Sequence, residues 1–279
     1  MRDAGSMRSA LVSSPALPQQ HRRKKSRLMT LLELHHVRKD FGGLRAVDDV
    51  SLNVPEGAIV GLIGPNGSGK STLINLIAGS ETLTAGRVVF AGQDISDFTP
   101  DAVYNTGIAR GYQEPALYFK MTVLDNVLLP VKEQRGEKPW HAPRWGSWQR
   151  EEAAGAERAM EALEQVQLGE HYATLAADLS GGQMKLLEIA RALMGTPKLL
   201  LLDEPTAGVA PKLAYEIFEQ IARLRAEYGI TFLIVEHRLE ILFDFVDTVY
   251  VMHLGNLLAQ GAPAEIVADA TLREVYFGE

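Results

Sequence analysis

The sequence predicts an α/β fold built around a parallel β-sheet, with a helical region inserted into it. Short apolar runs alternate with helix-forming sequence, which is typical of a sheet covered on both faces. A glycine-rich nonapeptide directly follows one of these runs and precedes a helix. Between about residues 122 and 194 the strand-like runs stop and helix-forming sequence takes over, which predicts an inserted helical region.

The candidate strands differ in their apolar pattern. Residues 32–37 and 50–54 alternate between apolar and polar side chains, which predicts two strands with one buried face each. Four further runs are apolar throughout, at residues 58–63, 198–202, 230–235 and 248–252. Runs of this kind predict buried parallel strands. Gly255 and Asn256 predict a hairpin turn after the last run.

The charge distribution separates a basic tail from an acidic body. The net charge of the 279 residues is -7, and residues 1–28 hold seven Lys or Arg against one Asp, so residues 29–279 carry -13. An acidic body argues against a general nucleic-acid surface, which needs clustered cations. Cysteine is absent, which excludes disulfides and thiolate sites. No apolar run approaches the roughly 20 residues of a membrane-spanning helix, so a membrane role requires a partner.

Residues 1–28 are predicted to be a disordered basic extension. Their polybasic run, residues 21–27, suits either a contact with anionic lipid or a solvated extension. Ordered pattern begins at Met29, where we expect the biological start. Within the helical region, residues 136–148 hold three tryptophans in a polar context, which favours a partner interface or packing against the insert.

The nonapeptide after the run at residues 58–63 is a complete P-loop. Its members are Gly64, Pro65, Asn66, Gly67, Ser68, Gly69, Lys70, Ser71 and Thr72. The glycines let backbone N–H groups turn towards phosphates, and the following helix N-terminus adds partial positive charge. Lys70 should reach the β- and γ-phosphates of ATP, and the Ser71 hydroxyl should coordinate Mg²⁺.

Two carboxylates follow the apolar run at residues 198–202, at the strand end where α/β sheets bind ligands. Asp203 is predicted to hold Mg²⁺ through its water shell, and Glu204 to polarise the attacking water as a general base. Paired acids at a strand end are often only solvated loop residues, but the P-loop in the same chain favours the functional interpretation.

A third motif precedes an amphipathic helix and consists of Leu179, Ser180, Gly181, Gly182 and Gln183. With this motif, the sequence resembles the ABC ATPases, whose signature is Leu-Ser-Gly-Gly-Gln and whose order of motifs is matched throughout. The resemblance implies a RecA-like P-loop NTPase core with an antiparallel β subdomain and an inserted α-helical subdomain. We place the core at about residues 29–117 and 195–279 and the helical subdomain at about residues 118–194.

The resemblance also implies a catalytic dimer. Ser180, Gly181, Gly182 and Gln183 would cap the γ-phosphate that the opposite protomer binds, so that two ATP molecules lie between head-to-tail chains. A hydroxyl and exposed N–H groups at a helix start suit an anion. Both a homodimer and a heterodimer with a sister ATPase fit the sequence.

Three more residues match family motifs. Gln113 lies at the junction of core and insert and corresponds to the glutamine that senses Mg²⁺ and the attacking water. His237 corresponds to the switch histidine at the γ-phosphate, although a histidine after a strand is often structural. Phe41 corresponds to the aromatic residue that stacks on adenine, with a core phenylalanine as the alternative. One departure is Ala210, where many family members carry an Asp that couples the two sites.

Smaller matches are closest to the ATPases of branched-chain amino-acid importers; they lie at residues 41–47, 107–113, 121–127 and 275–279. That resemblance implies transmembrane permease subunits as partners, an indirect role for a periplasmic or extracellular solute-binding protein, no nucleic-acid partner, and a peripheral location at the cytoplasmic face of the membrane. The sequence leaves urea or short-amide import, lipopolysaccharide export and a soluble non-transport ABC ATPase as alternatives. A P-loop kinase fits less well, because the signature motif and His237 argue against it.

Overall fold

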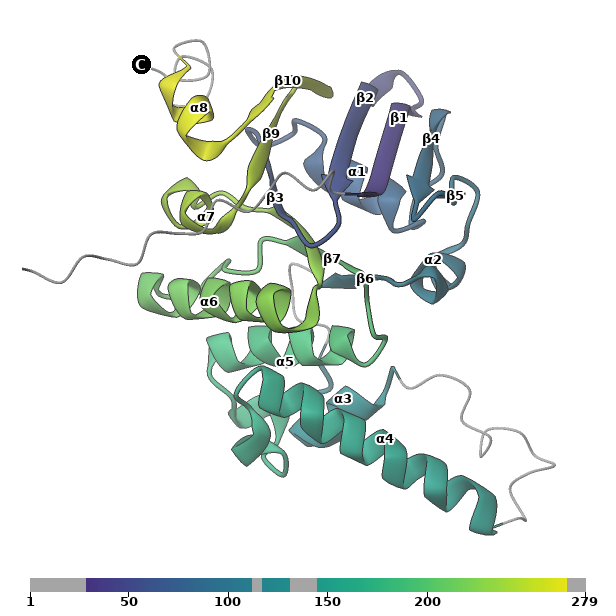
Figure 1. The fold of residues 1–279 in the computed structure, drawn as a ribbon, viewed down its shortest axis with the longest axis vertical. Coiled ribbons are helices and arrows are strands. Elements are labelled where there is room, and N and C mark those ends of the chain that lie inside the picture. The colour runs from purple at the N-terminus through teal and green to yellow at the C-terminus, as the bar shows by residue number, and fades with distance from the viewer. Residues whose placement is uncertain (1–28, 112–116, 131–144, 270–279) are drawn as a thin grey trace, which may run out of the picture.

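The computed structural model describes residues 29–111, 117–130 and 145–269, with side chains from residue 151 onward in the last range. These residues form a six-stranded sheet, a four-stranded sheet and surrounding helices (Figure 1). The basic extension, Gln113, Trp140 and the other two tryptophan side chains lie outside this description. The predicted boundaries of the helical subdomain therefore remain a prediction.

The larger sheet contains the four apolar runs that the sequence singled out. Its strands in spatial order are β10 (Asn256–Gly261), β9 (Thr248–His253), β3 (Ile59–Ile63), β8 (Thr231–Val235), β7 (Leu199–Asp203) and β6 (Ile108–Gly111). All neighbours are parallel except β10, which pairs antiparallel with β9. Every residue of β3, β7 and β8 is buried. Burial on both faces explains why these strands lack the alternation of a half-exposed strand.

The turn between β9 and β10 lies one residue earlier than predicted. Its central residues are Leu254 and Gly255, with φ angles of 46° and 83°, and Asn256 already pairs with His253. Two consecutive positive φ angles match a type I′ hairpin turn, whose twist suits the flanking strands. Pairing by Asn256 removes it from the turn, so the prediction of a Gly255–Asn256 turn was wrong by one position.

The smaller sheet is antiparallel, with the order β2 (Leu44–Pro55), β1 (Thr30–Phe41), β4 (Ala85–Phe90) and β5 (Gln93–Asp94). The two long strands contain the alternating segments predicted from the sequence. No apolar pattern in the sequence indicated β4, β5 and β6. β4 begins with small, exposed residues, and β6 is a four-residue strand at the sheet edge.

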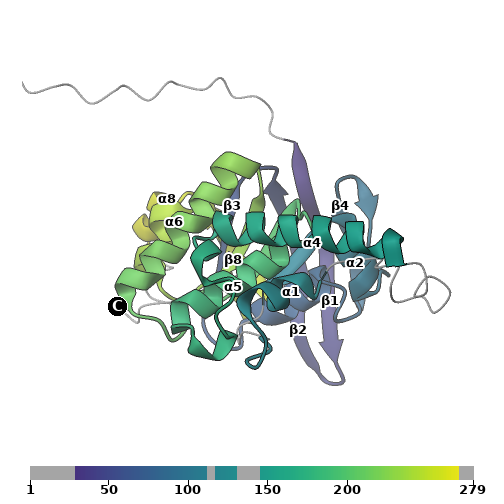
Figure 2. The same ribbon diagram turned by 90° about the horizontal axis from the view of Figure 1, so that it is seen from below.

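Helices cover both faces of the larger sheet (Figures 1 and 2). They are α1 (Lys70–Ile77), α2 (Pro100–Thr106), α3 (Val123–Leu128), α4 (Trp145–Gln165), α5 (Gly181–Leu193), α6 (Pro211–Tyr228), α7 (Leu239–Phe245) and α8 (Pro263–Ala268), with short 3-10 helices at Gly169–His171 and Ala176–Asp178. α3, α4 and α5 contact one another and form the helical part at the bottom of Figure 1.

The larger sheet separates two hydrophobic clusters. Ile59 and Ile63 of β3 belong to the cluster that includes side chains of α4, α5 and α6, whereas Val60 and Leu62 belong to the cluster that includes α1 and the smaller sheet. Successive side chains on a strand point to opposite faces, so this one strand contributes to both clusters. Because β8 and β9 pair with β3, the C-terminal ends of these two strands are held in place beside the P-loop that follows β3.

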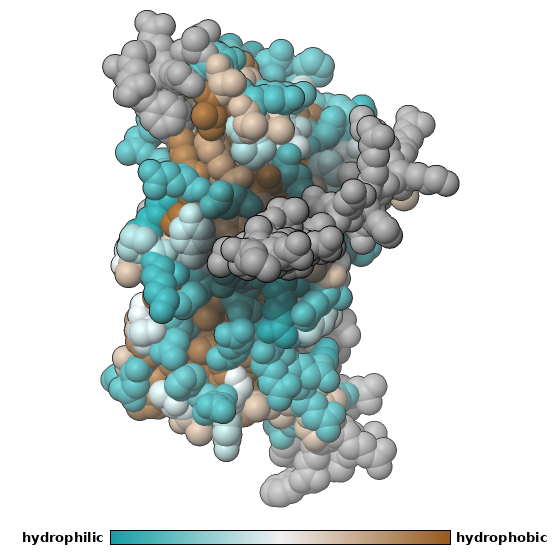
Figure 3. Space-filling view, turned by 60° about the vertical axis from the view of Figure 1, so that its left-hand side comes forward, coloured by the Kyte–Doolittle hydropathy of each residue, from teal (hydrophilic) through white to brown (hydrophobic). Residues whose placement is uncertain are grey.

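The described helices include none that is both long enough and apolar enough to cross a membrane. Hydrophilic residues cover most of the face shown in Figure 3, with patches of hydrophobic residues between them.

Candidate functional site

The P-loop connects the buried strand β3 to α1 and fits tightly against two other segments. A Cβ atom on Gly64 would lie 2.3 Å from the Met252 carbonyl oxygen, and one on Gly69 would lie 2.3 Å from the Ala46 carbonyl oxygen. Gly69 also has a φ of 101° and precedes the first helical residue. Glycine is therefore required at both positions for steric reasons. Because Gly69 has no side chain to cap α1, the first N–H groups of the helix are available to an anion.

The Lys70 side chain folds back over this loop. Its Nζ donates to the carbonyl oxygens of Gly64 at 2.8 Å and Pro65 at 3.0 Å, and the residue is only 5% exposed. Burial lowers the pKa of Lys70, while the carboxylates of Glu204 and Asp203 oppose the shift. The ammonium group thus lies in the centre of the loop, with two carboxylates near it.

Asp203 ends β7 and is 6% exposed. Burial raises its pKa, and the charge of Glu204 adds to the shift, whereas the guanidinium of Arg110, a hydrogen bond from Ser71 and the Lys70 ammonium oppose it. The structure thus brings Ser71 and Asp203 together, as the sequence predicted. A hydroxyl and a carboxylate fit Mg²⁺, which takes one or two protein ligands and fills its other positions with phosphate oxygens and water.

Glu204 and His237 form a pair at the ends of adjacent strands. His237 Nε2 lies 2.9 Å from Glu204 Oε1. Glu204 has a φ of 51°, which is uncommon for a side-chain-bearing residue and costs on the order of 1–3 kcal/mol. Its N–H donates to the Val235 carbonyl oxygen at 2.8 Å, and its carbonyl oxygen accepts from the Ala207 N–H at 3.0 Å. These two bonds hold the backbone so that the carboxylate is presented to His237.

A cavity of about 510 Å³ brings half of the predicted site residues together. It is lined by Phe41, Leu44, Arg45, Ala46, Asn66, Gly67, Gly69, Lys70, Ser71, Thr72, Glu204, His237, Leu254 and Gly255. One wall comes from β1 and β2, the floor from the P-loop, and the far side from the residues after β7 and β8. A cavity with an aromatic wall, phosphate-binding N–H groups and a carboxylate–histidine pair suits a nucleoside triphosphate.

Phe41 is 43% exposed, which rules out a core position, and Lys39 Nζ lies 4.7 Å from the centre of its ring.

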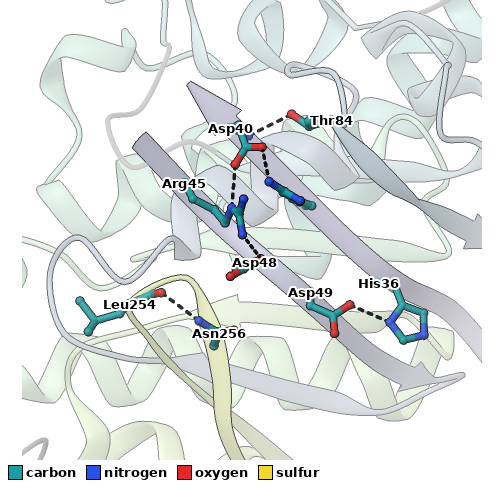
Figure 4. A network of polar contacts seen from close by, with 9 residues as sticks. His36, Asp40, Arg45, Asp48, Asp49, Thr84, Leu254 and Asn256 are labelled. Atoms are coloured by element: carbon teal, nitrogen blue, oxygen red, sulfur yellow. Dashed lines mark hydrogen bonds and ion pairs between the residues drawn. The ribbon is translucent and has the colours of Figure 1, made fainter. Parts of the chain in front are cut away.

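Arg45 lines the cavity but was not predicted from the sequence. Arg45 Nε lies 3.0 Å from Asp40 Oδ1 and its Nη1 lies 3.1 Å from Asp48 Oδ1, so its guanidinium is held between two strands (Figure 4). Pairing of Asp40 with Arg45 in the β1–β2 hairpin is the signal that could have placed it beside Phe41.

The signature residues lie at the N-terminus of α5 and do not line this cavity. Ser180 Oγ accepts from the Gln183 N–H at 3.3 Å, and Gln183 Oε1 accepts from the Ser180 N–H at 2.9 Å. Ser180 and Gly181 are exposed, whereas Gly182 packs against α6, where a Cβ atom would lie 2.2 Å from Leu213 Cδ2. That the signature residues contact a nucleotide bound by another protomer remains a prediction. The role of Gln113 also remains a prediction.

Comparison with known proteins agrees with this geometry. The ABC transporter family profile matches residues 47–207. The probable branched-chain amino acid transport ATP-binding protein LivG of Methanocaldococcus jannaschii is 44% identical over 255 residues, covering 90% of this chain and 98% of that protein. The high-affinity branched-chain amino acid transport ATP-binding protein LivG of Escherichia coli is 34% identical, covering 89% and 98%.

Two solved structures extend the comparison. The crystal structure of a nucleotide-free ATP-binding cassette from an ABC transporter matches with a TM-score of 0.79 and 43% identity, covering 90% of this chain and 100% of that chain. A dimeric post-hydrolysis state of a cassette bound to ADP and Pi matches with a TM-score of 0.69 and 28% identity, covering 84% and 99%. Motifs, fold and relatives agree, and the chain belongs to the ABC transporter family as one of its ATP-binding, ATP-hydrolysing cassettes.

Proposed function

We propose that this cassette hydrolyses ATP to power the import of branched-chain amino acids through a separate transmembrane permease. The ATPase part is supported by a single cavity that joins Phe41, the P-loop and the Glu204–His237 pair. The amino-acid part is supported by the names of relatives that are 34–44% identical over nearly their whole length.

The cassette would work as a dimer on the cytoplasmic face of the membrane, held there by the permease. Similar cassettes have been solved as dimers, one of them bound to ADP and Pi. In this chain Ser180 is exposed and lies outside the cavity, so it is free to meet a nucleotide bound by a second protomer. That protomer would be a second copy or a sister ATPase. A periplasmic or extracellular solute-binding protein would deliver the amino acid to the permease.

Different parts of the cavity would bind different parts of ATP. The Phe41 ring would stack on adenine, and the N–H groups of the loop and of the first turn of α1 would bind the phosphates. Lys70 would exchange its bonds to the Gly64 and Pro65 carbonyl oxygens for bonds to the β- and γ-phosphates.

Hydrolysis would be an in-line attack of water on the γ-phosphorus that breaks its bond to the oxygen bridging the β- and γ-phosphates. Glu204 would accept the proton of the water, and His237 would orient it. Mg²⁺, held by Ser71 and Asp203, would neutralise charge on the phosphates when bound. Lys70 and Ser180 of a partner subunit would stabilise the negative charge that spreads over the γ-phosphoryl oxygens.

Ala210 bears on how the two sites of a dimer communicate. It is exposed immediately before Pro211, the first residue of α6, and has no side-chain group that could cap the helix or cross an interface. Communication between the two sites would therefore depend on other groups than a carboxylate at this position.

Capture and reconstitution test this proposal. The Glu204→Gln variant is captured from detergent-solubilised host membranes in the presence of ATP, and the proteins that come with it are identified by mass spectrometry. The corresponding parent complex is then placed in lipid vesicles, where we expect ATP-dependent uptake of labelled leucine. The same complex with Lys70→Ala is the matched control and should show no uptake.

The alternative functions predict different results. Uptake of labelled urea or acetamide without leucine would support a short-amide importer, and extraction of lipopolysaccharide would support an exporter. Recovery of soluble or ribosomal partners alone would overturn the transport proposal and support a non-transport ABC ATPase.

A further inference from the structure

Three consecutive residues after β8 contact three points of the loop after β7. Glu236, His237 and Arg238 follow Val235, the last residue of β8, and residues 204–210 follow β7. His237 contacts Glu204 at the start of that loop. Glu236 and Arg238 contact positions further along it, so His237 lies between two ties that join the same pair of loops.

Glu236 makes the first tie. Glu236 is 2% exposed, and its carboxylate accepts from four donors. Oε1 accepts from the hydroxyl of Thr206 and from its N–H at 3.2 Å. Oε2 accepts from the N–H of His237 at 2.7 Å and of Arg238 at 3.3 Å. A buried carboxylate with this many donors fixes the distance between the two loops, because leaving any of these groups unpaired is costly.

Arg238 makes the second tie. Its Nη2 donates to the Val209 carbonyl oxygen at 2.7 Å. Val209 precedes Ala210, whose methyl side chain can neither donate nor accept a hydrogen bond. The tie therefore connects the histidine loop to the last residues before α6 without involving any side chain at position 210.

We propose that Glu236 and Arg238 are positioning residues that join the loops after β7 and β8 into one unit and thereby set the Glu204–His237 geometry. This inference rests on the proposed roles of Glu204 and His237 in hydrolysis. When His237 moves towards a γ-phosphate, both ties require the segment 206–209 to move with it. A displacement of about 1 Å at a reacting group can cost on the order of 10²-fold in rate, so loosening the ties should reduce turnover without changing how ATP is bound.

Substitutions at Thr206 test the first tie. Thr206→Val keeps the shape and removes the hydroxyl, and Thr206→Ser restores it. Thr231→Val is the matched control, because Thr231 is also fully buried and its Oγ1 accepts a hydrogen bond, from the Gly57 N–H at 2.9 Å, at the opposite end of β8. We expect Thr206→Val to lower kcat about tenfold or more with KM for ATP changed less than about twofold, while Thr206→Ser and Thr231→Val keep kcat near the parent value.

Two further variants keep the inference testable if Thr206→Val does not fold. Glu236→Gln has the same shape, but its amide can accept on one side only, and it should give the same loss of kcat. Arg238→Met removes the second tie from a partly exposed position and should lower kcat by a smaller factor. Each kcat is expressed per molecule that binds a fluorescent ATP analogue, so that unfolded protein does not count.

The outcomes separate this inference from the proposed function. If Thr206→Val and Thr231→Val have equal kcat values, or if Glu236→Gln turns over like the parent while Glu204→Gln does not, the first tie has no positioning role. If Arg238→Met turns over like the parent, the second tie has none. If Glu204→Gln itself turns over ATP at the parent rate, the assignment of the general base is wrong and the inference falls with it.

Discussion

At the scale of single residues, Phe41 lies in the wall of the nucleotide cavity with the Lys39 ammonium over its ring. Stacking of a base on an aromatic side chain is worth about 1–3 kcal/mol by alanine substitution. We therefore expect Phe41→Ala to weaken ATP binding by roughly 5- to 150-fold, measured by isothermal titration calorimetry. Phe41→Tyr, which keeps the ring, should bind like the parent. An unchanged affinity for the Ala variant would mean that adenine lies elsewhere.

Asp203 is a second residue whose role can be measured, through the pH dependence of the free energy of unfolding. Burial raises its pKa, so the contribution of Asp203 to stability is fully present below the unfolded-state pKa of about 3.8 and is lost as the pH rises through the higher folded-state value. Asp203→Asn, which stays neutral, should therefore stabilise the nucleotide-free protein at neutral pH by roughly 1 kcal/mol while abolishing Mg²⁺-dependent hydrolysis. Unfolding in urea at several pH values tests this.

The stability gain should shrink as the pH falls, because protonation then makes Asp203 neutral in the folded parent, as Asn already is in the variant. A variant that is less stable than the parent at pH 7 would show that the contacts of Asp203 with Arg110 and Ser71 outweigh its burial.

Sequence motifs located the residues of the site better than they located their neighbours. Phe41, the P-loop, Glu204 and His237 were each identifiable, because particular residue types are required at fixed points along the chain. Arg45 and Leu254 were missed because their places in the cavity wall depend on a strand register and a turn. The role of Glu236 depends on the packing of two loops that are separated by 30 residues in sequence.

At the scale of elements, α5 begins with a capping box, and we propose that its first residue also has an intermolecular role. Ser180 caps the helix in its own chain and is proposed to meet the nucleotide of another. α3 has the same kind of box, with Thr122 and Asp125. Because the two caps are alike, α3 provides a control for the structural part of the α5 cap.

Alanine substitutions at the two caps separate these roles. Ser180→Ala and Thr122→Ala should each lower the free energy of unfolding by about 1 kcal/mol, measured by urea denaturation. Only Ser180→Ala should also weaken the ATP-dependent dimer, measured by analytical ultracentrifugation in the Glu204→Gln background. If both variants dimerise like that background, Ser180 has no role beyond its own helix.

The elements themselves were predictable to different degrees. The buried strands β3, β7, β8 and β9 carry continuous apolar runs, so their positions followed from the sequence within one or two residues. β4, β5 and β6 are held by pairing with longer strands and lack a pattern of their own. Their existence depends on tertiary contacts that no local segment encodes.

At the scale of the whole molecule, the cavity spans both sheets, so a bound nucleotide should stabilise them together. At an ATP concentration about 100 times the dissociation constant, binding should contribute roughly 2.7 kcal/mol. For a chain of 279 residues, that corresponds to an increase in Tm of roughly 5 °C. Differential scanning calorimetry of Glu204→Gln with ATP tests this, with Lys70→Ala as the control that should show little increase. Two separate transitions with only one moved by ATP would contradict a cavity shared by both sheets.

The position of β3 in the sheet also has a consequence for folding during translation. This strand lies between β8 and β9, whose residues are made about 170–190 positions later. At about 5–20 residues per second, roughly 10–40 s pass between translation of β3 and the arrival of both neighbours. During that interval the strand leading into the P-loop has two unpaired edges and no finished sheet. The ribosome thus carries an incomplete ATP site throughout that interval, and the nascent apolar strand needs protection from aggregation until β8 and β9 have been made.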